Sequence, residues 1–354
     1  MLGIDSRVAR AAWTVVAVVL LLCLVYLLRR TLFVFILALL FAYLISPLVN
    51  QIDRFLPRRR SRTAALALAY IIFVGLVVLA GVQIGTRVVE QAQALTTKLP
   101  DMIRGAIDSW QKPTTGSPAL DSLKQEIASG IRNEAGNLIS RLVQASISVL
   151  SLASEVIYVV IIPILAFFFL KDAGAIRQHI LDLVAEGAHR ALLDEVLADI
   201  HLLLAHYMRA LVLLSASAFT AYVVFFSILG VPYAFLLAAL GGLLEFVPML
   251  GPLAAGVTIL VVAGVAGGHT LAVVIFLVAY RMVQDYGLSP YLMGQGVELH
   301  PLLVLFGVFS GAEIAGIAGA FLSVPVLALA RILYLRFRKA RMSVLYTSPT
   351  NLGS

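Results

Sequence analysis

Long uncharged stretches dominate the pattern of hydrophobic and polar positions along this chain. Residues 11–28 and 31–52 carry no charge, and residues 63–89 carry only Arg87, close to the end of the run. About 20 consecutive apolar residues suffice for a helix that crosses the hydrocarbon core of a bilayer. The pattern therefore predicts three transmembrane helices within residues 1–89.

Two stretches interrupt this apolar pattern with mixed charge. Residues 90–147 contain six Lys or Arg and six Asp or Glu residues, and their apolar side chains recur at helical spacing. Residues 171–208 have the same character. We interpret 90–147 as an external insert of amphipathic helices and 171–208 as amphipathic helices along the cytoplasmic face. Residues 148–170, between them, predict a fourth transmembrane helix.

The C-terminal transmembrane core, residues 209–335, contains the most informative stretch. Glu245 is the only formal charge in the 71 residues from 210 to 280. A carboxylate at the centre of a membrane helix costs roughly 2.5–3.5 kcal/mol even on lenient insertion scales. Pro248, Gly251 and Pro252 follow it closely, and a proline removes a backbone donor and crowds the carbonyl four residues earlier. The sequence predicts a broken helix here.

A broken helix that carries a lone carboxylate is typical of the midplane binding sites of secondary transporters. Non-helical backbone at membrane depth is tolerated only inside protein or beside a water-filled cavity. We therefore expect Glu245 to lie inside the helix bundle or in an aqueous cavity. The structural alternative is a kinked helix in which Glu245 only caps a freed backbone amide.

Further polar residues follow in the last third of the chain. Arg281 and Asp285 stand one helical turn apart, which is the spacing of a local ion pair. Ser289 and Pro290 are expected to stop that helix. The loop after it contains His300 and two glycines, but it lacks the spacing of a dinucleotide-binding turn, so no cofactor is expected there.

Two more carboxylates occur in apolar surroundings. Glu155 lies within the fourth span, where it either has a function or reaches the outer surface. Glu313 lies among small residues of the last apolar element, residues 302–335, and is a third candidate for a buried carboxylate. Either this element or residues 233–267 could form a re-entrant hairpin.

Composition agrees with a membrane protein. Hydrophobic residues make up 61%, charged residues 13%, and the mean hydropathy is +0.99, whereas soluble domains have roughly 45–50% apolar and 25% charged residues. We therefore expect an all-α, polytopic helical membrane protein with about eight transmembrane helices and broken or re-entrant helices in its C-terminal half. Cys23 is the only cysteine, which excludes a disulfide framework and a thiolate metal site.

The net charge of +7 does not indicate a nucleic-acid partner, because the basic residues gather at the ends of the apolar runs. There they orient the protein and meet the anionic headgroups of the lipid bilayer. Basic clusters follow the second span and fill the tail, residues 336–354. By the positive-inside rule both termini are expected to be cytoplasmic.

Several different short motifs follow one another through the apolar part of the chain. They are Phe41-Ala42-Tyr43 with Pro47; Ile162-Pro163-Ile164-Leu165 and Phe168-Phe169-Leu170-Lys171-Asp172; Glu245-Phe246-Val247-Pro248 with Gly251-Pro252; Gln284, Leu288-Ser289-Pro290 and Gly294; Leu299-His300-Pro301-Leu302; and Gly316, Gly319 and Val324-Pro325.

In this order the motifs resemble the autoinducer-2 exporter family of bacterial membrane transporters. The resemblance implies a multi-pass protein of the bacterial inner membrane that exports a small solute, such as a furanone signal, or exchanges sodium for protons. It also implies a homo-oligomer, with a pentamer as a candidate assembly. The motifs do not cover the insert or the tail, and they do not fix the substrate.

Two classes of function remain open at this point. One is a secondary transporter driven by an ion gradient, and the other is a passive oligomeric channel or membrane scaffold. No nucleophile, base and orienting group occur at a recognisable spacing, so neither catalytic residues nor an enzyme activity is expected, and no metal site or cofactor either. The candidate substrate- or ion-binding residues are Glu245, Pro248, Gly251, Pro252, Gln284, Asp285, Ser289 and Pro290, with Glu155, Glu313, Arg281 and His300 as secondary candidates.

Overall fold

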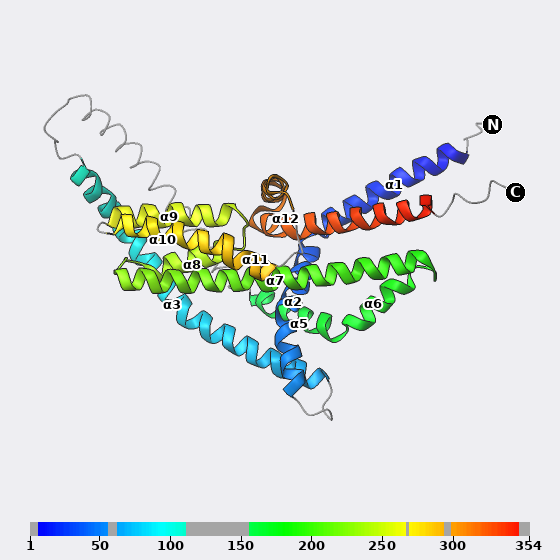
Figure 1. Ribbon diagram of the computed structural model, residues 1–354, viewed down its shortest axis with the longest axis horizontal. Coiled ribbons are helices and arrows are strands. Elements are labelled where there is room, and N and C mark those ends of the chain that lie inside the picture. Colours follow the sequence, from blue (N-terminus) through cyan, green and yellow to red (C-terminus); the bar gives the residue numbers. More distant parts are fainter. Residues whose placement is uncertain (1–5, 56–61, 111–155, 267–268, 294–298, 347–354) are drawn as a thin grey trace. The chain divides into compact units, whose positions relative to one another are not determined.

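The computed structural model describes residues 6–55, 62–110, 156–266, 269–293 and 299–346 (Figure 1). Within these ranges every regular element is helical, which confirms the expected all-α class. Five of the described helices are long and apolar enough to cross a membrane, and four shorter apolar helices accompany them. The fold is that of a polytopic helical membrane protein, whereas the expected count of eight crossings stays a prediction.

The chain divides into two compact units. The first comprises α1 (Ser6–Leu27), α2 (Arg29–Phe55), the start of α3 (Arg62–Trp110) as far as Tyr70, and α5 (Val156–Lys171). Its α2 and α5 pack along each other. Aromatic rings meet edge to face at this contact, with centroids 6.1 Å apart for Phe35 and Phe169.

The second unit contains the rest of α3 and the elements that follow α5. These are most of α6 (Ala173–Asp182), then α7 (Ala188–Leu229), α8 (Ala234–Leu244), α9 (Leu250–Ala266), α10 (Thr270–Val283), the π-helix η1 (Gln284–Leu288), α11 (Ser289–Met293) and α12 (Pro301–Tyr346).

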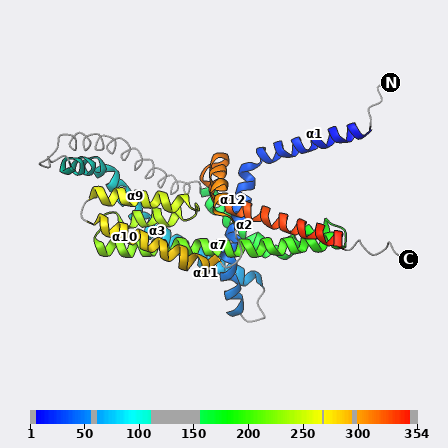
Figure 2. The ribbon, with the colours of Figure 1, turned by 45° about the horizontal axis from the view of Figure 1, so that its top comes forward.

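The core of the second unit lies between the C-terminal half of α7 and helices α8 to α10. Helices α9 and α10 run alongside this half of α7 in both views (Figures 1 and 2). The rings of Phe225 and Phe276 stack with centroids 3.8 Å apart, and Tyr222 and Phe226 complete the aromatic contact between α7 and α10. This core holds α8 and α10 in place, and Glu245 and Asp285 directly follow these two helices, in the α8–α9 break and in η1.

Helix α3 does not end at residue 89, where the insert was expected to begin. It continues to Trp110, and a stripe of buried apolar side chains from Val88 to Ile103 packs into the core of the second unit. Glu90, Lys98 and Asp101 lie exposed beside this stripe, so their charges do not interrupt the helix. The remainder of the predicted insert, residues 111–147, lies outside the described residues.

Helix α7 is also longer than the sequence suggests. Residues 171–208 were expected to be separate from a span that begins near residue 210, but a single helix runs from Ala188 to Leu229. No glycine or proline occurs between these ends, and Arg209 is exposed, so nothing breaks the helix there. Gly230 closes it in the left-handed conformation, with φ 70°.

Two parts of the second unit are helical hairpins. Helices α8 and α9 pack against each other across a short break, and with 11 and 17 residues both are shorter than the roughly 20 residues of a typical membrane-spanning helix. Helix α12 folds back at Ala315 and Gly316, whose φ values are −141° and 61°. The backbones of Gly311 and Gly319 touch at this bend because neither residue has a side chain. The sequence alone did not decide which of these two segments forms a hairpin, and in the structure both segments fold back on themselves.

Candidate functional site

The break between α8 and α9 runs from Glu245 to Met249 and occurs where the sequence predicts it. Pro248 lies within it, and Met249 adopts a left-handed conformation with φ 63°. Gly251 then passes so close to the backbone of Leu244 that a Cβ atom would overlap the carbonyl group. The turn therefore depends on a glycine at this position.

Glu245 occupies the first position after α8 and is buried, with 7% of its surface exposed. The amide Nε2 of Gln284 donates a hydrogen bond of 2.7 Å to its Oε2 atom. Arg281 Nη1 lies 3.8 Å from its Oε1 atom, at the distance of a weak ion pair. The carboxylate is thus held by two side chains from α10 and η1.

Arg281 also binds Asp285, whose Oδ2 accepts a hydrogen bond of 2.8 Å from the guanidinium Nε. This bond confirms the ion pair expected from the i, i+4 spacing. Glu245, Arg281 and Asp285 form a cluster of two carboxylates and one guanidinium, which we call the acidic triad. With both carboxylates ionised, the acidic triad carries one net negative charge.

Ser289 and Pro290 do not stop the helix, in contrast to the expectation from the sequence. The chain widens into the π-helix η1 one turn earlier and continues as α11 to Met293. Proline lacks an amide hydrogen and crowds the carbonyl four residues before it, here that of Tyr286. The wider π turn accommodates this loss, and π turns within helices are frequent at functional sites.

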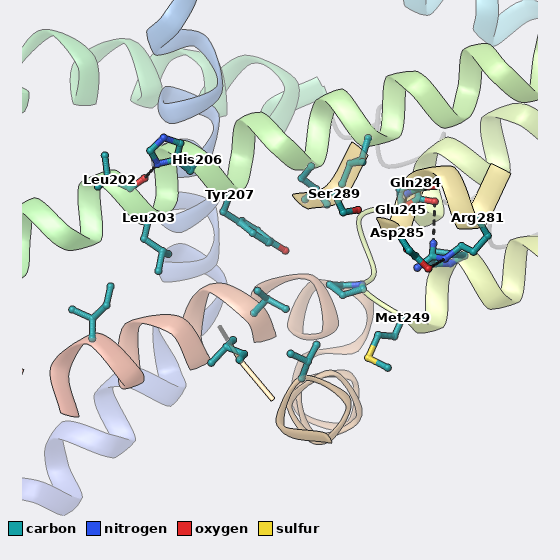
Figure 3. A pocket seen from close by; sticks show the side chains of 18 of the residues that line it. Leu202, Leu203, His206, Tyr207, Glu245, Met249, Arg281, Gln284, Asp285 and Ser289 are labelled. Atoms are coloured by element: carbon teal, nitrogen blue, oxygen red, sulfur yellow. Dashed lines mark hydrogen bonds and ion pairs between the residues drawn. The ribbon is translucent and has the colours of Figure 1, made fainter. Parts of the chain in front are cut away.

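A pocket of about 460 Å³ opens beside the acidic triad, within the second unit (Figure 3). Its walls come from α7, the α8–α9 break, η1 with the residues around it, and α12. Apolar side chains make up most of the lining, including Leu203 and Leu211 on α7 and Val324 on α12. A pocket of this size and character is typical of a small-molecule site.

Three buried polar atoms of the lining have no hydrogen-bond partner among the described residues. They are Tyr207 Oη, Gln284 Oε1 and Arg281 Nη1. Each unsatisfied buried polar group costs roughly 1–3 kcal/mol. Groups of this kind at a pocket wall can hydrogen-bond to a bound molecule or to ordered water.

The structure brings together seven of the residues singled out from the sequence. The pocket is lined by Glu245, Pro248, Pro252, Arg281, Gln284, Asp285 and Ser289.

The other candidates lie elsewhere in the fold. Gly251 shapes the turn and does not line the pocket, and Pro290 is exposed. His300 accepts the amide hydrogen of Leu302 at the start of α12. Glu313 is exposed, so its expected burial is wrong: it lies at the bend of α12, where Ile314 and Ile317 are exposed as well. Glu155 lies outside the described residues.

Sequence reasoning missed the α7 wall of the pocket, to which Asp199, His206 and Tyr207 belong. Their helix was interpreted as a surface element because its charges are mixed. One signal was present: Leu203, Tyr207 and Leu211 recur every four residues and form a continuous apolar stripe on one face. No cluster of three metal-binding side chains occurs in the ranges that the structure describes.

Comparison of the chain with known proteins shows which family it belongs to. A family model described as AI-2E family transporter matches residues 15–339. YueF of Bacillus subtilis, described as a candidate transport protein, is 26% identical over 319 residues, covering 85% of both chains. MT0215 of Mycobacterium tuberculosis, a candidate transport protein as well, is 28% identical over 303 residues, or 82% of this chain and 79% of the relative.

A third relative points the same way. PerM of Escherichia coli, described as a candidate permease, is 24% identical over 274 residues, covering 75% of this chain and 76% of the relative. The family match includes every residue that lines the pocket. The resemblance drawn from the sequence motifs is confirmed, and this multi-pass membrane transport protein belongs to the AI-2E transporter family.

Proposed function

We propose that this protein is a secondary transporter that exports a small polar solute under an ion gradient, with Glu245 as the coupling residue. The observation that carries the proposal is the position of Glu245. It is a buried carboxylate at a helix break, and it faces a pocket large enough for a small molecule. Intramembrane carboxylates in such positions commonly form ion and proton pathways.

The charges of the acidic triad support coupling. Arg281 bonds directly to Asp285 at 2.8 Å and reaches Glu245 only at 3.8 Å. When Glu245 takes up a proton, Arg281 and Asp285 still neutralise each other and the triad becomes neutral. A bound monovalent cation neutralises Glu245 in the same way. The triad therefore alternates between charges of −1 and zero, as ion coupling requires.

A sodium/proton antiporter is the alternative function. One carboxylate that binds a proton or a sodium ion, but not both, suffices for such exchange. The neighbouring pocket favours the solute exporter, because an ion exchanger needs no cavity of about 460 Å³ with an apolar lining. A passive channel or scaffold, in turn, needs no titratable group at Glu245.

We propose further that the protein resides in the bacterial inner membrane with both termini in the cytoplasm. The basic tail and the basic residues after the second span support this orientation. We also propose a homo-oligomer, with a pentamer as the candidate assembly, and no catalytic activity. We also propose that residues 90–147 contribute to the external surface and that residues 171–208 contribute to the cytoplasmic surface. Parts of the two segments belong to the helices α3 and α7.

The test is flux in proteoliposomes with a panel of small labelled solutes, with and without a proton gradient. Wild-type protein should export at least one solute, and the gradient should accelerate that flux. Glu245→Gln keeps the shape of the side chain and removes its titration, so the variant should lose the acceleration. Glu313→Gln is the matched control, because this carboxylate is exposed and lies outside the pocket.

The results separate the three functions. Acceleration that survives in Glu245→Gln would show that this carboxylate is structural and would favour the passive channel. If a sodium gradient alone moves protons while no solute of the panel moves, the antiporter is the correct function. An entrapped pH-sensitive dye records that exchange in the same vesicles.

A further inference from the structure

Tyr207 has an unusual position on α7. Its side chain is buried, with 4% of its surface exposed, yet its hydroxyl has no hydrogen-bond partner among the described residues. The hydroxyl does not face the packed core. It points into the pocket, as Figure 3 shows, and Tyr207 belongs to the lining.

Another buried tyrosine of the second unit shows what a structural hydroxyl does in this fold. Tyr280 on α10 lies 9% exposed in the core, and its hydroxyl is 3.1 Å from Ser217 Oγ on α7. That contact satisfies the group and links two helices. The hydroxyl of Tyr207 makes no comparable link, so a phenylalanine would fill the same space without an unsatisfied polar atom.

A second unsatisfied polar atom belongs to Gln284, which lines the pocket from another wall. Gln284 on η1 is 2% exposed, and its Nε2 atom donates to Glu245. Because this bond fixes the orientation of the amide, the carbonyl Oε1 is directed away from Glu245 as an acceptor. It has no partner in the described part of the chain.

The two atoms are chemically complementary to one kind of ligand. Gln284 Oε1 can only accept a hydrogen bond, whereas the tyrosine hydroxyl can donate or accept one. Neither group is charged. The surface around them is largely apolar, with Leu211 on α7 and Val304 and Val324 on α12.

We propose that Tyr207 is a specificity-determining residue of the transporter and that it selects, together with Gln284, a solute that carries hydroxyl groups. The solute donates a hydrogen bond to Gln284 Oε1, shares another with the hydroxyl of Tyr207, and packs its apolar part against α7 and α12. This inference rests on the proposed function, because it assigns the transported solute to the pocket beside Glu245.

Tyr207 selects the solute and takes no part in coupling. Replacement of Tyr207 by Phe changes no charge and leaves the acidic triad intact. A Tyr207→Phe variant should therefore keep the response to the ion gradient, whereas Glu245→Gln should lose it. The proposal on coupling is therefore tested by the response of Glu245→Gln to the ion gradient, and the proposal on selection by the solute preference of Tyr207→Phe.

The first test is thermal unfolding of Tyr207→Phe and Tyr280→Phe in detergent without added solute. Both substitutions remove one hydroxyl from a buried ring of the same unit. Tyr280→Phe breaks the contact with Ser217 and should lower the melting temperature. Tyr207→Phe removes an unsatisfied group and should leave the temperature unchanged or raise it. A decrease as large as that of Tyr280→Phe would show that the Tyr207 hydroxyl is structural and would overturn the proposal.

The second test is flux of labelled pentoses and small polyols, each paired with a deoxy analogue, in proteoliposomes under a proton gradient. Wild-type protein should prefer the fully hydroxylated member of at least one pair. In Tyr207→Phe the KM for that member should rise about two- to tenfold, the contribution of one net hydrogen bond. The preference over the deoxy analogue should fall by the same factor.

The same measurement includes its controls. Tyr280→Phe should keep the wild-type KM, and Tyr207→Phe should keep the acceleration by the proton gradient. An unchanged preference in Tyr207→Phe would overturn the proposal. So would the absence of flux for every hydroxylated probe when another solute is transported, because the pocket would then select a different chemistry.

Discussion

The turn between α8 and α9 allows a specific prediction about stability, because it has no room for a Cβ atom at Gly251. A Cβ atom added at Gly251 would overlap the backbone carbonyl of Leu244, as the turn stands. Gly256, on the same helix α9, has open space where its Cβ atom would lie. Gly251→Ala and Gly256→Ala are therefore the same chemical change in two different surroundings.

The expected effects have opposite signs. Overpacking costs typically about 1–3 kcal/mol when side chains can shift. At Gly251 the obstacle is backbone, which cannot rotate away, so we expect a loss of about 3 kcal/mol or more for Gly251→Ala. Alanine is better than glycine within a helix by roughly 0.8–1.0 kcal/mol. Gly256→Ala should therefore gain up to about 1 kcal/mol.

Thermal unfolding of the two purified variants in one detergent compares them directly, with the folded fraction followed by circular dichroism and gel filtration. Gly251→Ala should melt below the wild type, and Gly256→Ala at or above it. Because Gly251 shapes the turn beside Glu245, Gly251→Ala should also lose flux at temperatures where it is still folded. A Gly251→Ala protein that melts with the wild type would refute the close approach of Gly251 to Leu244.

Two further predictions concern contacts of α7 and α8. Arg336 on α12 is a quarter exposed and binds two carboxylates of α7, so Arg336→Gln should destabilise the protein by about 1–2 kcal/mol. Arg177→Gln, which breaks an exposed pair, should cost less than about 1 kcal/mol, and melting at low and high salt compares the two. Gln91 Oε1 accepts the backbone amide hydrogen of Leu236 in the first turn of α8, at 2.9 Å. Gln91→Leu should cost roughly 1–3 kcal/mol in unfolding experiments, whereas exposed Gln93→Leu should cost almost nothing.

Local chemistry in the sequence was sufficient to predict the centre of the site. Glu245 stands alone in a long apolar interval, and Pro248 and Gly251 follow it closely, so both the helix break and the burial of the carboxylate follow from the sequence. The contact between Arg281 and Asp285 follows from helical periodicity alone. These features depend on residues that are neighbours in the chain.

Features that depend on tertiary packing could not be predicted in this way. The charges along the first half of α7 suggest a surface helix, yet Tyr207 lies at the pocket because α12 packs against α7. Pro290 suggests a helix end, but a π turn absorbs the strain and the helix continues. The bond between Gln284 and Glu245 joins residues 39 positions apart, and no local pattern indicates it.

The source of stabilisation for Glu245 supports the proposed coupling to a proton or a monovalent cation. The residue follows the C-terminal end of α8, where the helix dipole is negative and disfavours a carboxylate. The first amides of α9 do not compensate, because those of Leu250 and Gly251 donate to carbonyl oxygens within the turn. Support comes instead from Gln284, which has no charge, and from Arg281, which Asp285 binds more closely. The fold thus leaves Glu245 with an incompletely balanced negative charge beside the pocket, and a proton or a monovalent cation is the simplest group that balances it.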